Sequence, residues 1–298
     1  MSKIAIVGSI NTDFVFRAKN LPLPSETISG DSFNINFGGK GANEAVALAR
    51  LGSTVSLFGA VGNDIFSVEN IKNLKKEKVN IKNIKTFSDI SGGAAGIAVG
   101  SGTNSIIVVP GANNKVDEAY LEKIKPLLME YDVIGTQLEI PLQTVKNLIM
   151  FAKNNGKTLI FNPSPMITLS QKLLDDCGYI VVNEIEIKQL PNYKSDSQLI
   201  KRYKGKLILT RGSEGVYYWD ERLSRVHNIP SLKIKTLDTT GAGDTFLAAF
   251  MHAISKKGPL EESLAFANIC AGLKVSKCGA QTGMPTIKEV NRFIAKSK

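Results

Sequence analysis

The sequence predicts a three-layer α/β/α fold, in which a mostly parallel central sheet lies between two layers of helices. One observation is a regular alternation of strand-like and helix-like segments through the second half of the chain. Another is a near-continuous apolar strand at residues 3–10, of the kind that a parallel sheet buries on both faces. Because residues 1–298 contain no repeat, low-complexity segment or linker, we expect a single domain.

The next hundred residues predict strands of two kinds. An apolar run at 54–61 predicts a second buried strand, and residues 68–79 predict a helix. Residues 14–37 alternate apolar and polar residues in places, and residues 92–109 are first rich in glycine and then apolar. Both of these segments predict short exposed strands, so we expect them to form a small second sheet.

Residues 117–210 predict the alternating part of the central sheet. A polar or acidic residue ends or directly follows each predicted strand, at the edge where open α/β sheets bind ligands. Each such residue alone is better explained as a turn or a helix cap, but their recurrence at one edge predicts a site. The strands are expected at 132–138, 157–162, 179–183 and 206–210, with Glu139 directly after the first and Asn162, Asn183 and Thr210 as the last residues of the other three. The helices are expected near 117–130, 141–155, 168–176, 184–190 and 196–203.

The composition is ordinary for an enzyme that lies outside membranes. Hydrophobic residues make up 43% and charged residues 21% of the chain, and no apolar run approaches the ~20 residues of a membrane span. The chain opens on a strand and not on a secretory signal, so we expect a cytoplasmic protein with no membrane partner. The net charge is +10, but the lysines are scattered, and the densest group, Lys72–Lys78, has the spacing of a solvated helix face. No nucleic-acid partner is therefore expected.

The cysteines and histidines do not predict a zinc site or a histidine-dependent triad. Cys177, Cys270 and Cys278 lack the paired spacing of zinc ligands, and His227 and His252 are the only histidines. We expect the cysteines to be reduced and structural.

The segment Asp238–Phe246, which reads D-T-T-G-A-G-D-T-F, is the central candidate for a catalytic site. A buried strand or turn is expected before it and an amphipathic helix after it. At such a helix start, the N–H groups of Gly241, Ala242 and Gly243 form an anion site. A carboxylate there repels phosphate, so Asp244 is expected to act as a base on a hydroxyl that attacks the phosphate. From these residues alone, a helix cap explains Asp244 equally well.

Two segments near the N-terminus carry polar groups suited to a sugar. Asn11 and Asp13 are two residues apart, so in an extended strand they point the same way, although turn positions explain them equally well. The run F-G-G-K-G-A-N at residues 37–43 opens a predicted helix but lacks the spacing of a P-loop. Its glycines instead allow the backbone to approach a ligand, with Lys40 and Asn43 as donors.

Together these motifs resemble the ribokinase family of sugar kinases, also called PfkB-type carbohydrate kinases. The resemblance covers nearly the whole chain and rests on G-S-I-N-T-D, F-G-G-K-G-A-N-E-A-V-A-L-A-R-L-G, Q-L-E-I-P, V-V-N-E-I-E, T-R-G-S-E-G-V, L-D-T-T-G-A-G-D-T-F and K-C-G-A-Q. It implies a ribokinase-like fold with a small β-sheet lid over the sugar, formed by residues around 14–37 and 92–109.

The resemblance also implies a reaction and assigns residues to it. ATP would give its γ-phosphate to a primary hydroxyl of a pentose, D-ribose giving ribose 5-phosphate, with help from Mg²⁺. By resemblance, the sugar is held by Asn11, Asp13, Gly39, Lys40, Asn43, Glu139 and Asp244, and ATP by Asn183, Thr210, Gly212, Ser213, Gly215, Gly243 and Asn268. Gly241, Ala242 and Gly243 form the anion hole, Asp244 is the base, and Glu186 orders Mg²⁺ through water.

Two further expectations follow from the family. Its members are often activated by a monovalent cation such as K⁺, which here would bind near Asp238, Thr240, Lys274, Lys277 and Gly279, where backbone carbonyls are expected to lack helical partners. Family lids commonly pair across a homodimer, and the open edges of a small sheet favour such pairing.

The chain departs from the family pattern in four places. Glu44, Asn268 and Gly283 stand where family members have glutamine, histidine and serine, and the lid segment 92–104 is unusually rich in small residues. The last difference leaves the substrate open, with deoxyribose, fructose, a nucleoside and pseudouridine as alternatives. A catalytically silent sugar-binding protein is another alternative, which the presence of Asp244 disfavours.

Overall fold

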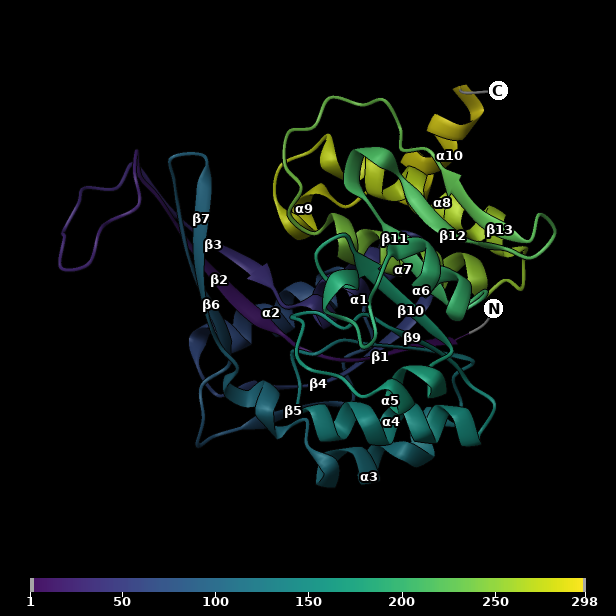
Figure 1. Cartoon of the computed structure of the whole chain (residues 1–298). Helices are drawn as coiled ribbons and strands as arrows, with labels where there is room; N and C mark the ends of the chain where they lie inside the picture. The colour runs from purple at the N-terminus through teal and green to yellow at the C-terminus, as the bar shows by residue number, and fades with distance from the viewer. Residues whose placement is uncertain (1–2, 297–298) are drawn as a thin grey trace.

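The computed structural model describes residues 3–296, which form one large and one small β-sheet (Figure 1). The strands of the large sheet are β1 (Lys3–Val7), β4 (Thr54–Gly62), β5 (Ile84–Phe87), β8 (Val133–Thr136), β9 (Thr158–Phe161), β10 (Tyr179–Asn183), β11 (Leu207–Thr210), β12 (Val216–Asp220) and β13 (Arg225–Ile229). Among the described residues their order is β13-β12-β11-β10-β9-β8-β1-β4-β5. Strands β11, β12 and β13 pair antiparallel, and the other neighbours pair parallel.

The central strands are buried on both faces because their side chains alternate between two cores. In β1, Ile4 and Ile6 pack into one core, and Ala5 and Val7 into the other. One face is covered by α3 (Glu118–Leu128), α4 (Leu142–Asn154), α5 (Gln171–Asp176) and α6 (Asp196–Arg202), and the other by α1 (Lys40–Arg50), α2 (Ile65–Lys76), α7 (Ala242–Ile254), α8 (Leu260–Val275) and α10 (Ile287–Lys296) (Figure 1). The predicted three-layer fold is confirmed.

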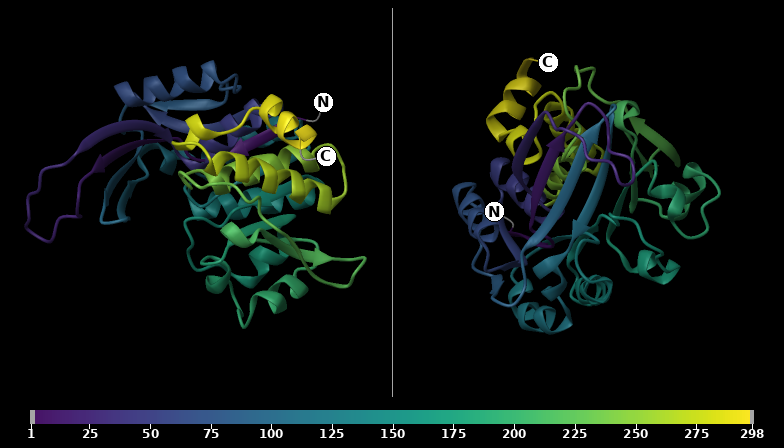
Figure 2. Two further views of the ribbon diagram at one scale, coloured as in Figure 1. Left: turned by 90° about the horizontal axis from the view of Figure 1, so that it is seen from above. Right: turned by 90° about the vertical axis from the view of Figure 1, so that its left-hand side faces the viewer.

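The small sheet consists of β2 (Asn11–Arg17), β3 (Ser32–Gly38), β6 (Gly93–Gly100) and β7 (Thr103–Val109), in the order β3-β2-β6-β7. Its strands come from the two segments predicted to form a second sheet. Figure 2 shows the small sheet extending away from the layered body. Because β2 follows β1 after three residues, the sugar-site residues predicted on it lie where the two sheets meet.

Some elements differ from the prediction. Residues 184–190 form a turn and the short 3₁₀ helix η2 (Ile187–Gln189) in place of an α-helix. The segment before Asp238 is irregular and not a buried strand, and its Leu237 is exposed. Strands β5, β12 and β13 were not predicted. Within residues 3–296, no helix has the length and apolar character needed to cross a bilayer.

Candidate active site

The predicted site residues gather at the carboxyl ends of the parallel strands. A cavity of about 230 Å³ lies there, between the first turn of α7 and the ends of β9, β10 and β11. Its lining includes Lys40, Asn162, Asn183, Glu186, Thr210, Gly241, Gly243 and Asp244. Residues from five distant parts of the sequence therefore meet at one edge of the sheet, as the α/β alternation predicts.

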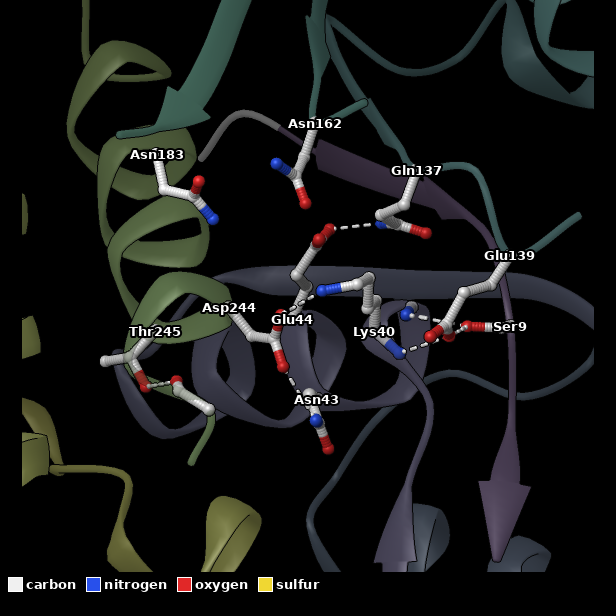
Figure 3. Close-up of polar contacts among 12 residues, drawn as sticks. Ser9, Lys40, Asn43, Glu44, Gln137, Glu139, Asn162, Asn183, Asp244 and Thr245 are labelled. Atoms are coloured by element: carbon white, nitrogen blue, oxygen red, sulfur yellow. Dashed lines mark hydrogen bonds and ion pairs between the residues drawn. The ribbon is translucent and has the colours of Figure 1, made fainter. Parts of the chain in front are cut away.

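Asp244 lines this cavity, and its carboxylate is oriented by α1. The side chain is 10% exposed, and its Oδ2 accepts a hydrogen bond of 2.7 Å from Asn43 Nδ2 (Figure 3). Asn43 is fixed in turn by Gln281, whose Nε2 donates to Asn43 Oδ1 at 3.0 Å. The other carboxylate oxygen, Oδ1, lies 3.9 Å from Lys40 Nζ. A carboxylate that is held at one oxygen and faces the cavity has the geometry of a base.

Lys40 is the cation of the site. It opens α1 after Gly39, and its side chain reaches towards Asp244 (Figure 3). Burial opposes the positive charge, but the carboxylates of Asp244 and Glu139 outweigh it and raise the pKa of Lys40 above its usual value of 10.5. The lysine therefore carries its charge at neutral pH and can attract a phosphate group.

The loop that opens α7 has the backbone shape expected of an anion site. Gly241 has φ 77°, a left-handed conformation, and a Cβ at this position would approach Ala280 to 3.2 Å. Thr245 fixes the loop because its N–H and hydroxyl both donate to Gly241 O, at 2.9 and 2.8 Å. The Ala242 N–H donates to Thr239 O at 3.0 Å, so the predicted role of Ala242 as a free donor needs correction. The first-turn N–H of Gly243 has no acceptor within the helix.

The predicted sugar residues converge on the junction of β1 and β2. Asn11 and Asp13 lie on the same face of β2, as their spacing predicts. Glu139 Oε2 accepts hydrogen bonds from the Lys40 N–H at 3.0 Å and from Ser9 Oγ at 2.5 Å (Figure 3). A Cβ on Gly39 would lie 2.6 Å from Asn11 N, so only glycine permits this close approach. Asn11 Nδ2 also donates to Glu139 Oε2 at 3.5 Å, so amide and carboxylate groups lie close together here.

Asp13 carries an unusual proton affinity. Desolvation, together with the negative charges of Glu139 and Asp244, raises the pKa of the Asp13 carboxyl to about 6. Asp13 is therefore ionised at neutral pH and becomes protonated in mildly acidic solution.

The predicted ATP residues line a second cavity of about 520 Å³ that adjoins the first. All seven lie on its wall, namely Asn183, Thr210, Gly212, Ser213, Gly215, Gly243 and Asn268. Asn183, Thr210 and Gly243 line both cavities, so a molecule in the second can extend into the first. Asn268 Nδ2 donates to Pro230 O at 2.7 Å, which ties the cavity wall to α8.

Asn183 and Glu186 hold each other in a tight turn. Asn183 Oδ1 accepts from the Glu186 N–H at 2.8 Å, and Glu186 Oε2 accepts from the Asn183 N–H at 2.9 Å. These two reciprocal bonds form a capping box, a pattern that opens helices, and the helix that follows here is only the short 3₁₀ helix η2. Residues 3–296 contain no group of three or more His, Cys, Asp or Glu side chains able to hold a metal together. A magnesium ion here would therefore be held mainly by phosphate oxygens and water, with Glu186 as one carboxylate at the edge.

The sequence reasoning missed three residues that position the site. Ser9 donates to Glu139, Asn113 Nδ2 donates to Asn11 Oδ1 at 2.7 Å, and Gln281 donates to Asn43. Asn113 and Gln281 are more than 100 residues from their partners, so local patterns carry no signal for them.

Glu44 and Gln137 form a buried pair next to Asp244 (Figure 3). Gln137 Nε2 donates to Glu44 Oε2 at 2.5 Å, and Glu44 Oε1 is buried with no hydrogen-bond partner. Burial first, and then repulsion from Asp244, raise the pKa of Glu44 well above its usual 4.5. Burial therefore favours the protonated, neutral form of Glu44, at a position where the family pattern is expected to have glutamine.

We expect Glu44→Gln to stabilise the protein at neutral pH by about 1–3 kcal/mol, since it removes a buried group that resists ionisation. An acid whose pKa is higher in the folded chain favours the folded state fully below its unfolded pKa, and loses that advantage as the pH rises. The difference in Tm between variant and wild type should therefore widen from pH 4.5 to pH 8. A difference that is constant with pH would show that Glu44 does not titrate differently in the folded state.

The cation site predicted behind the anion loop does not fit the structure. The Nζ of Lys274 donates to the carbonyl oxygens of Asp238 and Lys277, at 2.9 and 3.3 Å. These are carbonyl groups of the kind that were expected to bind K⁺. The Lys274 ammonium already occupies these carbonyl groups, so the predicted pocket exists but contains a lysine side chain in place of a free ion.

Fold and site together define an ATP-dependent sugar kinase. Residues 1–287 match the pfkB family carbohydrate kinases, and the chain belongs to that family. It is 37% identical to the ribokinase of Bacillus subtilis over 99% of this chain and 100% of that protein, and 38% identical to that of Lactococcus lactis over 97% and 96%.

Solved structures agree with this family. The ribokinase of Thermotoga maritima has a TM-score of 0.90 at 30% identity, covering 99% of this chain and 100% of that chain. A ribokinase of Arabidopsis thaliana, described as complexed with ribose and ATP, has a TM-score of 0.87 at 27% identity, covering 98% of each chain.

Proposed function

We propose that this protein phosphorylates the primary hydroxyl of D-ribose with ATP, giving ribose 5-phosphate. The observation that carries the proposal is the position of Asp244, which lines the smaller cavity at the point where Gly243 and Thr210 join it to the cavity assigned to ATP. The curated ribokinases that match the whole chain support ribose as the acceptor.

In this proposal the reaction runs across the junction of the two cavities. ATP lies in the larger cavity with its phosphates directed at the first turn of α7. Ribose is held by Asn11, Asp13 and Glu139, so that its primary hydroxyl faces Asp244. Asp244 takes the hydroxyl proton as the oxygen attacks the γ-phosphorus, and ADP leaves in line. Lys40 and the N–H of Gly243 stabilise the charge on the transferred group.

Magnesium belongs to this proposal, and a monovalent cation does not. Mg²⁺ would arrive with ATP and neutralise phosphate charge, and Glu186 is the carboxylate placed to hold it through water. The pocket expected to bind K⁺ contains the Lys274 ammonium. The cytoplasmic location stays a prediction from the sequence.

The substrate is tested by a coupled assay of ATP consumption with ribose, deoxyribose, fructose, adenosine and pseudouridine. We expect ribose to give the highest kcat/KM. The deoxyribokinase of Salmonella typhi, 31% identical over 98% of this chain and 98% of that protein, makes deoxyribose the alternative to compare most closely. A preference for deoxyribose would change the assigned sugar but not the role of Asp244. Sugar binding without any ATP consumption would favour a catalytically silent binding protein.

We further propose that the protein forms a homodimer through its small sheet. The pairing register places Phe16, Phe33, Ile107 and Val109 on one face of this sheet, and each of these side chains is about half exposed or more. Between them β6 contributes small residues, so the face is open and apolar. Such a patch marks an interaction surface, and a second copy of the same sheet complements it in kind.

We expect wild-type protein to scatter light as a dimer at micromolar concentration and Phe16→Asp to scatter as a monomer, because a carboxylate at the centre of an apolar interface costs several kcal/mol. Leu223→Asp is the matched control, since Leu223 is an exposed apolar residue outside the small sheet. A wild-type monomer, or dissociation by both variants alike, would count against the proposed interface.

A further inference from the structure

Lys274 is a fully buried lysine next to the catalytic loop. It lies in the last turn of α8, and its side chain is 0% exposed. Lysine is almost never buried to this extent unless partners compensate its charge. Its Nζ donates to Asp238 O at 2.9 Å and to Lys277 O at 3.3 Å. The partners are therefore backbone carbonyls from the segment before the anion loop and from the turn after α8.

Gly283 makes room for this side chain. A Cβ at position 283 would lie 3.1 Å from Lys274 Cε and 3.2 Å from the carbonyl oxygens of Lys277 and Cys278. A serine in its place would crowd the lysine, and glycine supplies no side-chain oxygen to an ion. The two residues are complementary, because one fills the pocket with a cation and the other allows it to fit.

The pocket is coupled to the anion loop through Asp238. The Asp238 carboxylate accepts hydrogen bonds from the Thr240 N–H at 2.9 Å and from the Gly279 N–H at 2.7 Å. The Asp238 carbonyl meanwhile accepts from Lys274. Asp238 thus joins the turn after α8 to the residues that directly precede Gly241. Whatever fixes the carbonyl of Asp238 also fixes the backbone that aligns the N–H groups for the phosphate.

We propose that the Lys274 ammonium replaces the monovalent cation in this protein, so that catalysis is independent of K⁺. Lys274 is a positioning residue, since it acts through the loop and does not touch substrate. Burial lowers the pKa of Lys274, while the negative charge of Asp238 opposes that effect and favours the ammonium. A covalently attached cation is always present at the site, whereas a free ion must be bound from solution. The inference rests on the proposed kinase activity only in the test that measures turnover.

The kinetic test compares turnover in K⁺ and in tetramethylammonium at equal ionic strength. We expect equal rates for the wild type. Lys274→Ala should lose about tenfold or more in tetramethylammonium, because two buried carbonyls lose their donor, and should recover in K⁺ or NH₄⁺. Adding Gly283→Ser to this variant supplies an oxygen ligand and should lower the K⁺ concentration needed. Lys157→Met is the matched control, since Lys157 Nζ also donates to a backbone carbonyl, that of Met129, but outside the site.

A second test measures Tm as a function of K⁺ concentration and needs no turnover. A specifically bound ion stabilises the folded state in proportion to its occupancy. We expect no K⁺-specific rise in Tm for the wild type and a clear rise for Lys274→Ala.

Activation of the wild type by K⁺, or a K⁺-specific rise in its Tm, would overturn the proposal, and both measurements stand even when the variant does not fold. A loss in Lys274→Ala that no small cation restores would likewise overturn it. Absence of kinase activity with every sugar would overturn the proposed function alone, because the Tm measurement still tests the pocket.

Discussion

Asp244→Asn is expected to lower kcat by about 10²–10⁴-fold while changing sugar affinity much less. The substitution keeps the size of the side chain, and the remaining carbonyl oxygen can still accept the hydrogen bond from Asn43 Nδ2. What it removes is the negative charge that accepts the proton of the attacking hydroxyl. It also removes the carboxylate that contributes most to the raised pKa of Lys40. Both changes reduce the stabilisation of the transition state more than that of the bound ground state.

The measurement is kcat from the coupled assay, together with ribose affinity from calorimetry. Asp220→Asn is a matched control, because Asp220 is also a buried aspartate but lies at the end of β12, outside both cavities. We expect this control to turn over like the wild type. Near-normal turnover of Asp244→Asn would remove Asp244 from the mechanism and leave it the role of a helix cap.

The sequence could predict which residues lie together at the candidate site, because they stand at strand ends and in glycine-rich turns. Asn183 and Thr210 follow strands whose apolar runs are easy to recognise, and parallel pairing brings such ends to one edge. Glycine-rich turns are equally visible in a sequence, since Gly241 is required by a left-handed backbone. The two segments of the small sheet were recognisable because their alternating and small-residue patterns differ from those of the buried strands.

The sequence could not predict contacts that depend on tertiary packing. A lysine in the last turn of a helix is normally exposed, and nothing local indicates that Lys274 turns inward. Its burial depends on Gly283 and on the carbonyl of Asp238, which only the fold brings together. The occupation of the Ala242 N–H by Thr239 and the pairing of Glu44 with Gln137 are hidden for the same reason.

Asp13→Ala is expected to weaken ribose binding by tens-fold or more and to leave ATP binding in place. A hydrogen bond from a hydroxyl to a charged carboxylate contributes ~1.5–3 kcal/mol, which corresponds to about ten- to more than a hundredfold in affinity. Asp13 lies on β2, in the small sheet, and does not line the cavity assigned to ATP. Asp31→Ala is a suitable control, because Asp31 is an exposed aspartate just before β3.

The raised pKa of Asp13 adds a pH signature to this prediction. Because the carboxyl titrates near pH 6, it is an ionised acceptor at pH 8 and a neutral acid at pH 5. Ribose affinity measured by calorimetry should therefore fall as the pH drops through 6. Asp13→Asn, which cannot titrate, should bind ribose weakly at both pH values and show little of this dependence.

If Asp13→Ala bound ribose as tightly as the wild type, the hydroxyl groups of the sugar would have to lie away from β2. Unchanged affinity between pH 8 and pH 5 in the wild type would instead mean that the protonated carboxyl serves equally well, as a donor to a sugar oxygen.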